Sequence, residues 1–221
     1  MGTTKPKDFV EISYTGYSQG SMFDSNREAD LKSINSKAKA KKTIIVIGEG
    51  MVVKGLDKAL EGKEVGKEYE IKLSPKEGFG ERDRNLMKTI PLKVFTDQRI
   101  NPVPGAVLDM DGMIAKIISI SGARVMTDFN NPLAGKELSY KFSITRIITD
   151  DKEKATALFE NMFRFVPEFD ITAENLTIKG PKPLEQFAQA FKDKIKALLN
   201  KELKFEEKKI EKKEDKIFKS A

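Results

Sequence analysis

The sequence predicts an α+β protein with three parts: an antiparallel sheet wrapping a short helix, a small inserted all-β domain, and a C-terminal α+β module. Three observations support this prediction. Segments with a period of two, typical of half-buried strands, occur near the start of the chain and again after residue 135. Between them, apolar runs flank Asp111-Gly112, a strong hairpin signal. The last third contains two segments with helical periodicity.

The first part should form one sheet from strands on both sides of the insert. Strands are expected at residues 8–14, 18–25, 44–47 and 67–73, and a short helix at 52–60. Residues 26–42 are polar and Lys-rich, which predicts a loop with about one helical turn. Residues 75–82 predict another loop. Residues 136–148 alternate again, so we expect them to rejoin the first sheet as its closing strand.

The inserted part should be a small meander of three strands. Apolar stretches occupy residues 106–110, 113–120 and 123–129, and a mixed segment with Pro91 precedes them. The run from Asp109 to Gly112 has the start of a calcium loop, but the later ligands and the closing Glu are missing. A hairpin turn is therefore the favoured interpretation, and no metal site is predicted.

The C-terminal module begins after a charged segment, residues 149–153, which is a candidate linker. A helix is expected at 152–165, two short strands within 169–179, and an amphipathic helix at 183–203. The apolar stripe of the second helix fits a core, and a homodimer interface is the alternative. The tail, residues 204–221, predicts frayed helix or disorder. The expected domains are residues 1–85 with 132–150, residues 86–131, and residues 151–221.

Composition restricts the chemistry available to this chain. There is no His, Cys or Trp among the 221 residues, which excludes disulfides, thiol catalysis and ordinary zinc or haem sites. The net charge is +6, but Lys and Glu alternate along the chain. This pattern favours a solvated surface over nucleic-acid binding. No apolar run reaches membrane-spanning length and the N-terminus lacks an apolar signal core, so we expect a cytoplasmic protein without membrane contact.

A series of motifs occurs in an ordered arrangement. Its members are Tyr14 to Gly16, Phe23 to Ser25, residues 50–56 (GMVVKGL), Gly78 to Gly80, Leu133 to Gly135, and Phe142. In this order they resemble the FKBP family of peptidyl-prolyl cis/trans isomerases. The segment between Gly80 and Leu133 is similar to the insert-in-flap domain of the SlyD-like branch. The added C-terminal part is similar to the long archaeal-type members.

The resemblance implies an isomerase that needs no cofactor and uses an FKBP-type half-barrel. Asp24 would sit at the pocket rim, and the Val53 backbone N–H would hold a substrate carbonyl. The pocket for proline would be lined by Tyr14, Phe23, Val52, Val53, Leu56, Phe79 and Phe142, with Met51, Leu133 and Ala134 also binding substrate. Leu56 stands where many members have Trp, and Phe79 where many have Tyr, so tight macrolide binding is not expected.

The individual residues have structural alternatives. An aromatic residue at strand spacing is commonly a core residue, and Asp24 could serve only as a turn residue that accepts backbone N–H groups. Only the ordered set points to a catalytic pocket.

The insert carries many apolar side chains for its size. Some of them should be exposed, and Met-rich exposed surface binds partners promiscuously. The resemblance implies the same use: a chaperone surface for unfolded or nascent polypeptides and Xaa-Pro peptides. Its expected contacts are Met110, Met113, Met126 and Phe129. Two alternatives stay open: a fully buried mini-core, and a holdase that has lost isomerase activity.

Overall fold

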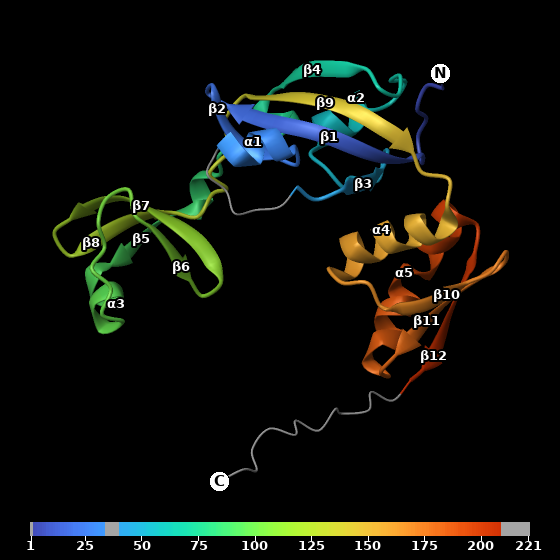
Figure 1. The fold of residues 1–221 in the computed structure, drawn as a ribbon. Helices are drawn as coiled ribbons and strands as arrows, with labels where there is room; N and C mark the ends of the chain where they lie inside the picture. Colours follow the sequence, from blue (N-terminus) through green and yellow to red (C-terminus); the bar gives the residue numbers. More distant parts are fainter. Residues whose placement is uncertain (1, 34–39, 209–221) are drawn as a thin grey trace, which may run out of the picture.

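A computed structural model describes residues 2–33 and 40–208. Its largest sheet has five antiparallel strands and packs on one short helix (Figure 1). The strand order is β2-β1-β9-β4, and β3 pairs with the same edge of β1 as β2 does. The elements are β1 (Phe9–Ser18), β2 (Ser21–Ser25), β3 (Thr43–Val46), α2 (Lys54–Ala59), β4 (Glu68–Leu73) and β9 (Leu138–Ile147). The α+β class and the antiparallel sheet are confirmed.

The closing strand β9 shows why these residues form this sheet. Its even-numbered side chains Leu138, Tyr140, Phe142 and Ile144 are buried against α2, while the intervening residues are at least partly exposed. A strand presents alternate side chains to opposite faces, so the sequence period of two becomes one apolar face. Three short helices connect the strands at the surface: α1 (Glu28–Ser33), η1 (Pro75–Glu77) and η2 (Arg84–Leu86).

The insert forms its own four-stranded antiparallel sheet in the order β5-β8-β7-β6. Its elements are β5 (Met87–Pro91), α3 (Leu92–Asp97), β6 (Val107–Met110), β7 (Met113–Ser121) and β8 (Arg124–Asp128). Asp111 and Gly112 have φ values of 54° and 78° and form the expected hairpin turn between β6 and β7. The prediction of three strands was wrong, because the insert has a fourth strand, β5, and a helix, α3. The mixed segment that holds Pro91 forms β5, which ends at Pro91 on an edge of the sheet, where proline is tolerated.

Two chain segments join the insert to the first sheet, residues 82–83 on the way in and residues 128–130 on the way out. We call this connection the neck. The Asn130 side chain accepts a hydrogen bond from the Asp83 N–H (2.8 Å) and donates one to the Asp83 carbonyl (2.9 Å). Asp128 is 6% exposed, and it accepts hydrogen bonds from Asn130 and forms an ion pair with Arg82. The neck is therefore a bonded connection rather than a pair of free loops.

The C-terminal module packs two helices against a three-stranded sheet in the order β10-β11-β12 (Figure 1). Its elements are α4 (Asp151–Phe163), β10 (Glu168–Ile171), β11 (Asn175–Gly180), α5 (Pro183–Leu199) and β12 (Glu202–Glu207). Phe9 and Val46 of the first sheet, and Ile148 directly after β9, share one buried cluster with α4 and α5. Residues 149–153 are not a free linker, because Asp150 caps α4 through the Glu153 N–H (2.7 Å).

The predicted helix at 183–203 was too long at its C-terminal end, and the tail prediction was wrong over residues 204–207. The helix ends at Asn200, whose φ of 55° stops the helical path, and the chain continues as β12 in parallel register with β11. Leu203 and Phe205 alternate toward the module core, a pattern too short to stand out among charged residues. Residues 209–221 of the predicted tail lie outside the described residues.

Candidate functional site

Aromatic rings gather on the face of the first sheet that carries α2. The Phe23 ring meets the Tyr140 ring edge-on at 5.8 Å between centroids, and it meets Phe79 edge-on at 6.2 Å. Tyr14 lies 6.2 Å from Tyr140. Phe23, Tyr14 and Phe79 are half-buried, so each presents ring surface to solvent as well as to its neighbours. We call Tyr14, Phe23, Phe79 and Tyr140 the aromatic cluster.

A glycine lets two of these rings lie against the backbone of β1. A Cβ atom at Gly16 would lie 2.7 Å from Phe23 Cζ, closer than real Cβ contacts allow, and 3.0 Å from Tyr140 Cε1, which is tighter than most. Gly16 also sits at a register shift in the pairing of β1 with β2. Its missing side chain therefore shapes the aromatic cluster, which gives the glycine of the early motif a packing role.

Asp24 is the carboxylate of this site. It is exposed at the end of β2, and the Tyr14 hydroxyl donates a hydrogen bond of 2.9 Å to its Oδ2. Burial, followed by the charge and hydrogen bond of Asp24, raises the pKa of Tyr14 well above its ordinary value. Tyr14 therefore remains protonated at neutral pH and continues to donate to Asp24.

Tyr140 is a site residue that the motif comparison did not single out. Burial, with a further contribution from the Asp24 charge, raises its pKa to about 12. Tyr140 is two residues from Phe142 on β9, so the strand period places both on the same face. That spacing is the signal by which the sequence could have indicated it.

Two predicted pocket residues lie beneath the cluster. Phe142 is 0% exposed and stacks on Tyr69 at 5.6 Å, while Leu56 of α2 is 1% exposed. Both support the rings from the core. Val52 and Val53 are half-buried beside them, just before α2.

The loop before α2 is held by a buried carboxylate. Asp57 accepts hydrogen bonds from the Gly48 N–H (2.8 Å) and the Gly50 N–H (2.9 Å) and is 7% exposed. This fixes the path into Val52 and Val53. Within the described chain, the Val53 N–H has no hydrogen-bond acceptor, so it is open to a ligand carbonyl.

Asn26 holds the backbone of Tyr14. β3 pairs with β1 up to Ile12 and β2 pairs from Thr15, which leaves a gap along this edge of β1. The Asn26 side chain fills the gap: Oδ1 accepts from the Tyr14 N–H (2.8 Å), and Nδ2 donates to the Ile12 carbonyl (2.7 Å) and to Thr43 Oγ1 (3.0 Å). The Asn26 N–H donates to the Tyr14 carbonyl at 3.2 Å. The sequence analysis missed this residue, because a side chain replacing a strand segment leaves no periodic signal.

The remaining predicted contacts fall in two places. Met51 and Leu133 are half-buried against the core of the first sheet, and Ala134 is 5% exposed. On the insert, Met113 is 54% and Met126 is 41% exposed. Met110 and Phe129 are half-buried, and Met110 packs against the small core of Phe95, Ile117 and Val125.

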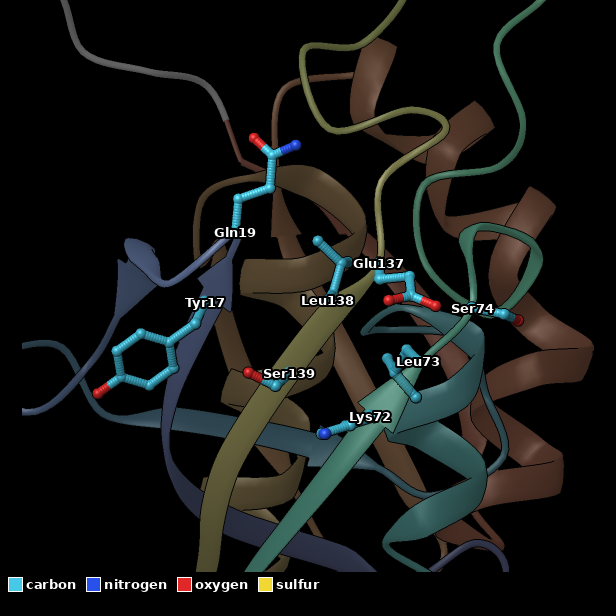
Figure 2. A pocket seen from close by; sticks show the side chains of 8 residues that line it. All are labelled: Tyr17, Gln19, Lys72, Leu73, Ser74, Glu137, Leu138 and Ser139. Carbon is cyan, nitrogen blue, oxygen red and sulfur yellow. The ribbon is translucent and has the colours of Figure 1, made fainter.

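A hollow of about 400 Å³ lies at the end of the same sheet, where β1 and β4 end and β9 begins. Figure 2 shows it lined by Tyr17, Gln19, Lys72, Leu73, Ser74, Glu137, Leu138 and Ser139. Tyr17 and Ser139 are register partners that alternate with Gly16 and Tyr140, so the Tyr17 side chain lies on the face of the sheet opposite the aromatic cluster. Tyr17 is thus a natural control position for the site.

In the part of the chain that the structure describes, no group of three or more acidic side chains is placed to hold a metal ion. No helix there is long and apolar enough to cross a membrane.

The chain was compared with known proteins. Residues 2–94 match the model for FKBP-type peptidyl-prolyl cis-trans isomerase, and residues 88–133 match the model "FKBP26, IF domain". The chain is 30% identical over 152 residues to a "Short-type peptidyl-prolyl cis-trans isomerase" of Methanocaldococcus jannaschii, covering 67% of this chain and 97% of that protein. This chain belongs to the FKBP-type peptidyl-prolyl cis-trans isomerase family. The resemblance inferred from the ordered motifs is confirmed.

Bacterial relatives are also similar. SlyD of Haemophilus influenzae is 34% identical over 110 residues, and SlyD of Escherichia coli is 28% identical over 103 residues. These alignments cover 44% and 45% of this chain and 53% of each SlyD. The chain thus spans about half the length of these SlyD relatives. As an FKBP-type isomerase, it acts on proline-containing polypeptides.

Proposed function

We propose that the aromatic cluster and Asp24 are the catalytic site, and that a proline ring packs against Phe23, Phe79 and Tyr140. The observation that supports this most directly is the convergence of these rings around the Tyr14–Asp24 hydrogen bond. Aromatic faces give a flat apolar ring a large contact area. The sequence has no His or Cys to supply a conventional nucleophile or base, and this reaction needs neither.

The chemistry follows from the nature of the amide bond. Resonance gives the C–N bond partial double-bond character and a rotation barrier of about 18–20 kcal/mol. The twisted transition state has lost that resonance and its charge separation, so it is less polar than either planar isomer. An apolar surface that excludes water therefore favours the twisted form relative to the ground state. No proton has to be transferred.

The polar groups of the site would orient the substrate. The Val53 N–H would hold the carbonyl of a neighbouring substrate residue, while Asp24 would face the twisting Xaa-Pro carbonyl. The Tyr14 hydrogen bond fixes one carboxylate oxygen of Asp24, and the residue as a whole is exposed. Leu56 and Phe142 would act through the rings that they support.

A protease-coupled peptide assay tests this assignment. We expect Phe23→Ala to lower kcat/KM by about ten-fold or more, since it removes a ring that contacts the proline. Tyr17→Phe, on the opposite face of β1, should leave kcat/KM unchanged. Wild-type turnover no faster than background, with intact folding, would support the alternative that the protein is a holdase without isomerase activity.

We further propose that the insert binds unfolded or nascent polypeptides in the cytoplasm. The insert exposes many apolar side chains, from the loop before β6 and from its sheet: Val103, Val107, Met113, Ile114, Ile118, Ile120 and Met126. A small unit has too little interior to bury them all, and flexible Met side chains adapt to varied partners. Captured chains would be held near the catalytic site, which raises the effective concentration of their Xaa-Pro bonds.

Refolding of a proline-limited protein separates capture from catalysis. The double variant Met113→Gln/Met126→Gln should slow assisted refolding several-fold while short-peptide turnover stays at the wild-type rate. Val166→Gln changes an equally exposed residue of the C-terminal module and serves as the matched control. If the double variant refolds the protein as fast as wild type, the insert is not the capture surface.

The proposed division assigns residues 1–85 and 132–150 to the isomerase domain, 86–131 to the capture domain, and 151–221 to the C-terminal domain. The alternative role of the last domain is a homodimer contact. Phe165 and Val166 are 52% and 40% exposed after α4, which supports that alternative. Sedimentation of the full chain at increasing concentration tests it, and a constant monomer mass would exclude it.

A further inference from the structure

A groove of about 190 Å³ runs between the first sheet and the C-terminal module. One wall is formed by residues 41–45, which lead into and include most of β3. The opposite wall is one face of α4, where Ala157, Glu160 and Asn161 follow each other at helical spacing, with Arg164 at the end. Met51 completes the lining. None of these groups belongs to the aromatic cluster.

β3 is an edge strand with outward-facing backbone groups. Its only strand partner among the described elements is β1. In antiparallel pairing, alternate residues direct their N–H and C=O groups away from the partner. Val46 is closed to a ligand, because it is 1% exposed, its N–H is bonded to Met51 Sδ at 3.3 Å and its carbonyl accepts from the Glu49 N–H at 3.3 Å. Ile44, which lines the groove, has the same place in the alternation as Val46, so the edge that can take a new strand lies at Ile44 and the residues before it.

The rim of the groove is cationic. Lys41, Lys42 and Arg164 line it with a single acid, Glu160. None of the three cations forms an ion pair with another residue in the described part of the chain. Glu153 lies near Lys42, but its carboxylate is bound by the Arg146 guanidinium. The rim therefore complements an anionic ligand.

The two walls are held at a fixed spacing. Arg146 of β9 bonds both Glu11 of β1 (2.9 Å) and Glu153 of α4 (2.9 Å). The loop after β3 is tied to α5 by the Lys194–Glu49 ion pair at 3.0 Å. The shared apolar cluster lies beneath these contacts. A ligand would enter a preformed groove and would not have to order its walls.

The groove is continuous along the chain with the proposed catalytic site. Met51 packs against the cores on both sides and is followed directly by Val52 and Val53.

We propose that this groove binds an extended acidic segment of a polypeptide substrate, which adds as a strand to the outer edge of β3. Backbone hydrogen bonds would bind any extended chain, and Lys41, Lys42 and Arg164 would select Glu or Asp side chains. The inference rests on the proposal that unfolded chains are substrates. It gives the C-terminal module a defined role, which is to form the second wall of a binding site.

Binding of proline-free peptides to the full chain tests the groove separately from the catalytic site and the insert. The probe is a heptapeptide that alternates Glu with Val, and the control peptide alternates Gln with Val. We expect the Glu peptide to shift amide resonances of residues 41–45 and 157–164 in ¹⁵N NMR spectra. The Gln peptide should bind about ten-fold more weakly at low salt, where ion pairs at an exposed rim contribute most.

Charge-reversal variants of the protein measure the ionic contribution to binding, and N-methylated peptides measure the contribution of backbone hydrogen bonds. Lys42→Glu/Arg164→Glu should weaken the Glu peptide about ten-fold, whereas Lys182→Glu/Lys204→Glu makes the same change in net charge elsewhere on the module and should leave affinity within two-fold. N-methylation of alternate peptide amides should abolish strand addition. Equal affinity of the Glu and Gln peptides, equal affinity of the N-methylated peptide, or shifts confined to the insert would each overturn the proposal. Normal short-peptide turnover by the charge-reversal variant shows that its catalytic site is intact.

Discussion

Replacing Asn26 with Ala should destabilise the protein and loosen the catalytic site together. The substitution removes the three hydrogen bonds made by the side chain and leaves the Tyr14 N–H and the Ile12 carbonyl without partners. An unpaired buried backbone group costs about 1–3 kcal/mol. Both groups are partly buried, so water can reach them in the variant, and we expect a total loss of about 2–4 kcal/mol.

Urea unfolding followed by circular dichroism measures this loss. Thr43→Val is the matched control, because it removes one partner of Asn26 and leaves the bonds to Tyr14 intact; its cost should stay near 1 kcal/mol. A free energy of unfolding for Asn26→Ala within about 0.5 kcal/mol of the wild-type value would contradict this role of Asn26, and so would equal destabilisation of the two variants.

Activity shows whether Asn26 acts through Tyr14. Asn26 fixes the backbone that carries the hydroxyl bonded to Asp24, so its loss should lower kcat/KM for a short Xaa-Pro peptide in conditions where the variant is folded. The loss should be smaller in a Tyr14→Phe background, because that background already lacks the bond. Additive effects in the double-mutant cycle would mean that Asn26 supports stability alone.

Three further predictions concern other contacts. Gly16→Ala should lower the free energy of unfolding by about 1–3 kcal/mol and reduce peptide turnover, because the new methyl group displaces the Phe23 ring. A variant with wild-type stability and turnover would contradict the packing of this ring against β1. The Arg146 hydrogen bond lowers the Glu153 pKa below its usual 4.5, so the contribution of this pair to stability is complete above that pH and is lost as pH falls through the lower folded pKa. Arg146→Ala should remove this acid sensitivity from the unfolding curve, and an unchanged pH profile would refute the assignment. Asn130→Ala should broaden the range of insert orientations in small-angle scattering without changing short-peptide turnover, whereas identical scattering would show that the neck bonds do not set the orientation.

Much of the fold could be predicted because its signals are local. The alternation in residues 136–148 follows from one buried face, and the Asp111-Gly112 turn needs positive φ at two adjacent positions. The catalytic residues could be proposed because their motifs occur in a fixed order. β5 and β12 were missed for the opposite reason: each is short and mostly exposed, and each is a strand because of the neighbour with which it pairs.

The available chemistry follows from the amino-acid composition and order alone: the chain has no thiol and no imidazole, and it places aromatic residues at strand spacing beside Asp24. Which of these rings meet depends on how the strands pair and pack. In the folded protein Phe23 and Phe79 are partly exposed and Phe142 is buried beneath them. Tyr140, which is on β9 with Phe142, joins the aromatic cluster. The tertiary structure also turned the expected linker into a fixed junction, because Phe9, Val46 and Ile148 complete the C-terminal core. These outcomes depend on contacts between residues far apart in the chain, for which no local pattern exists.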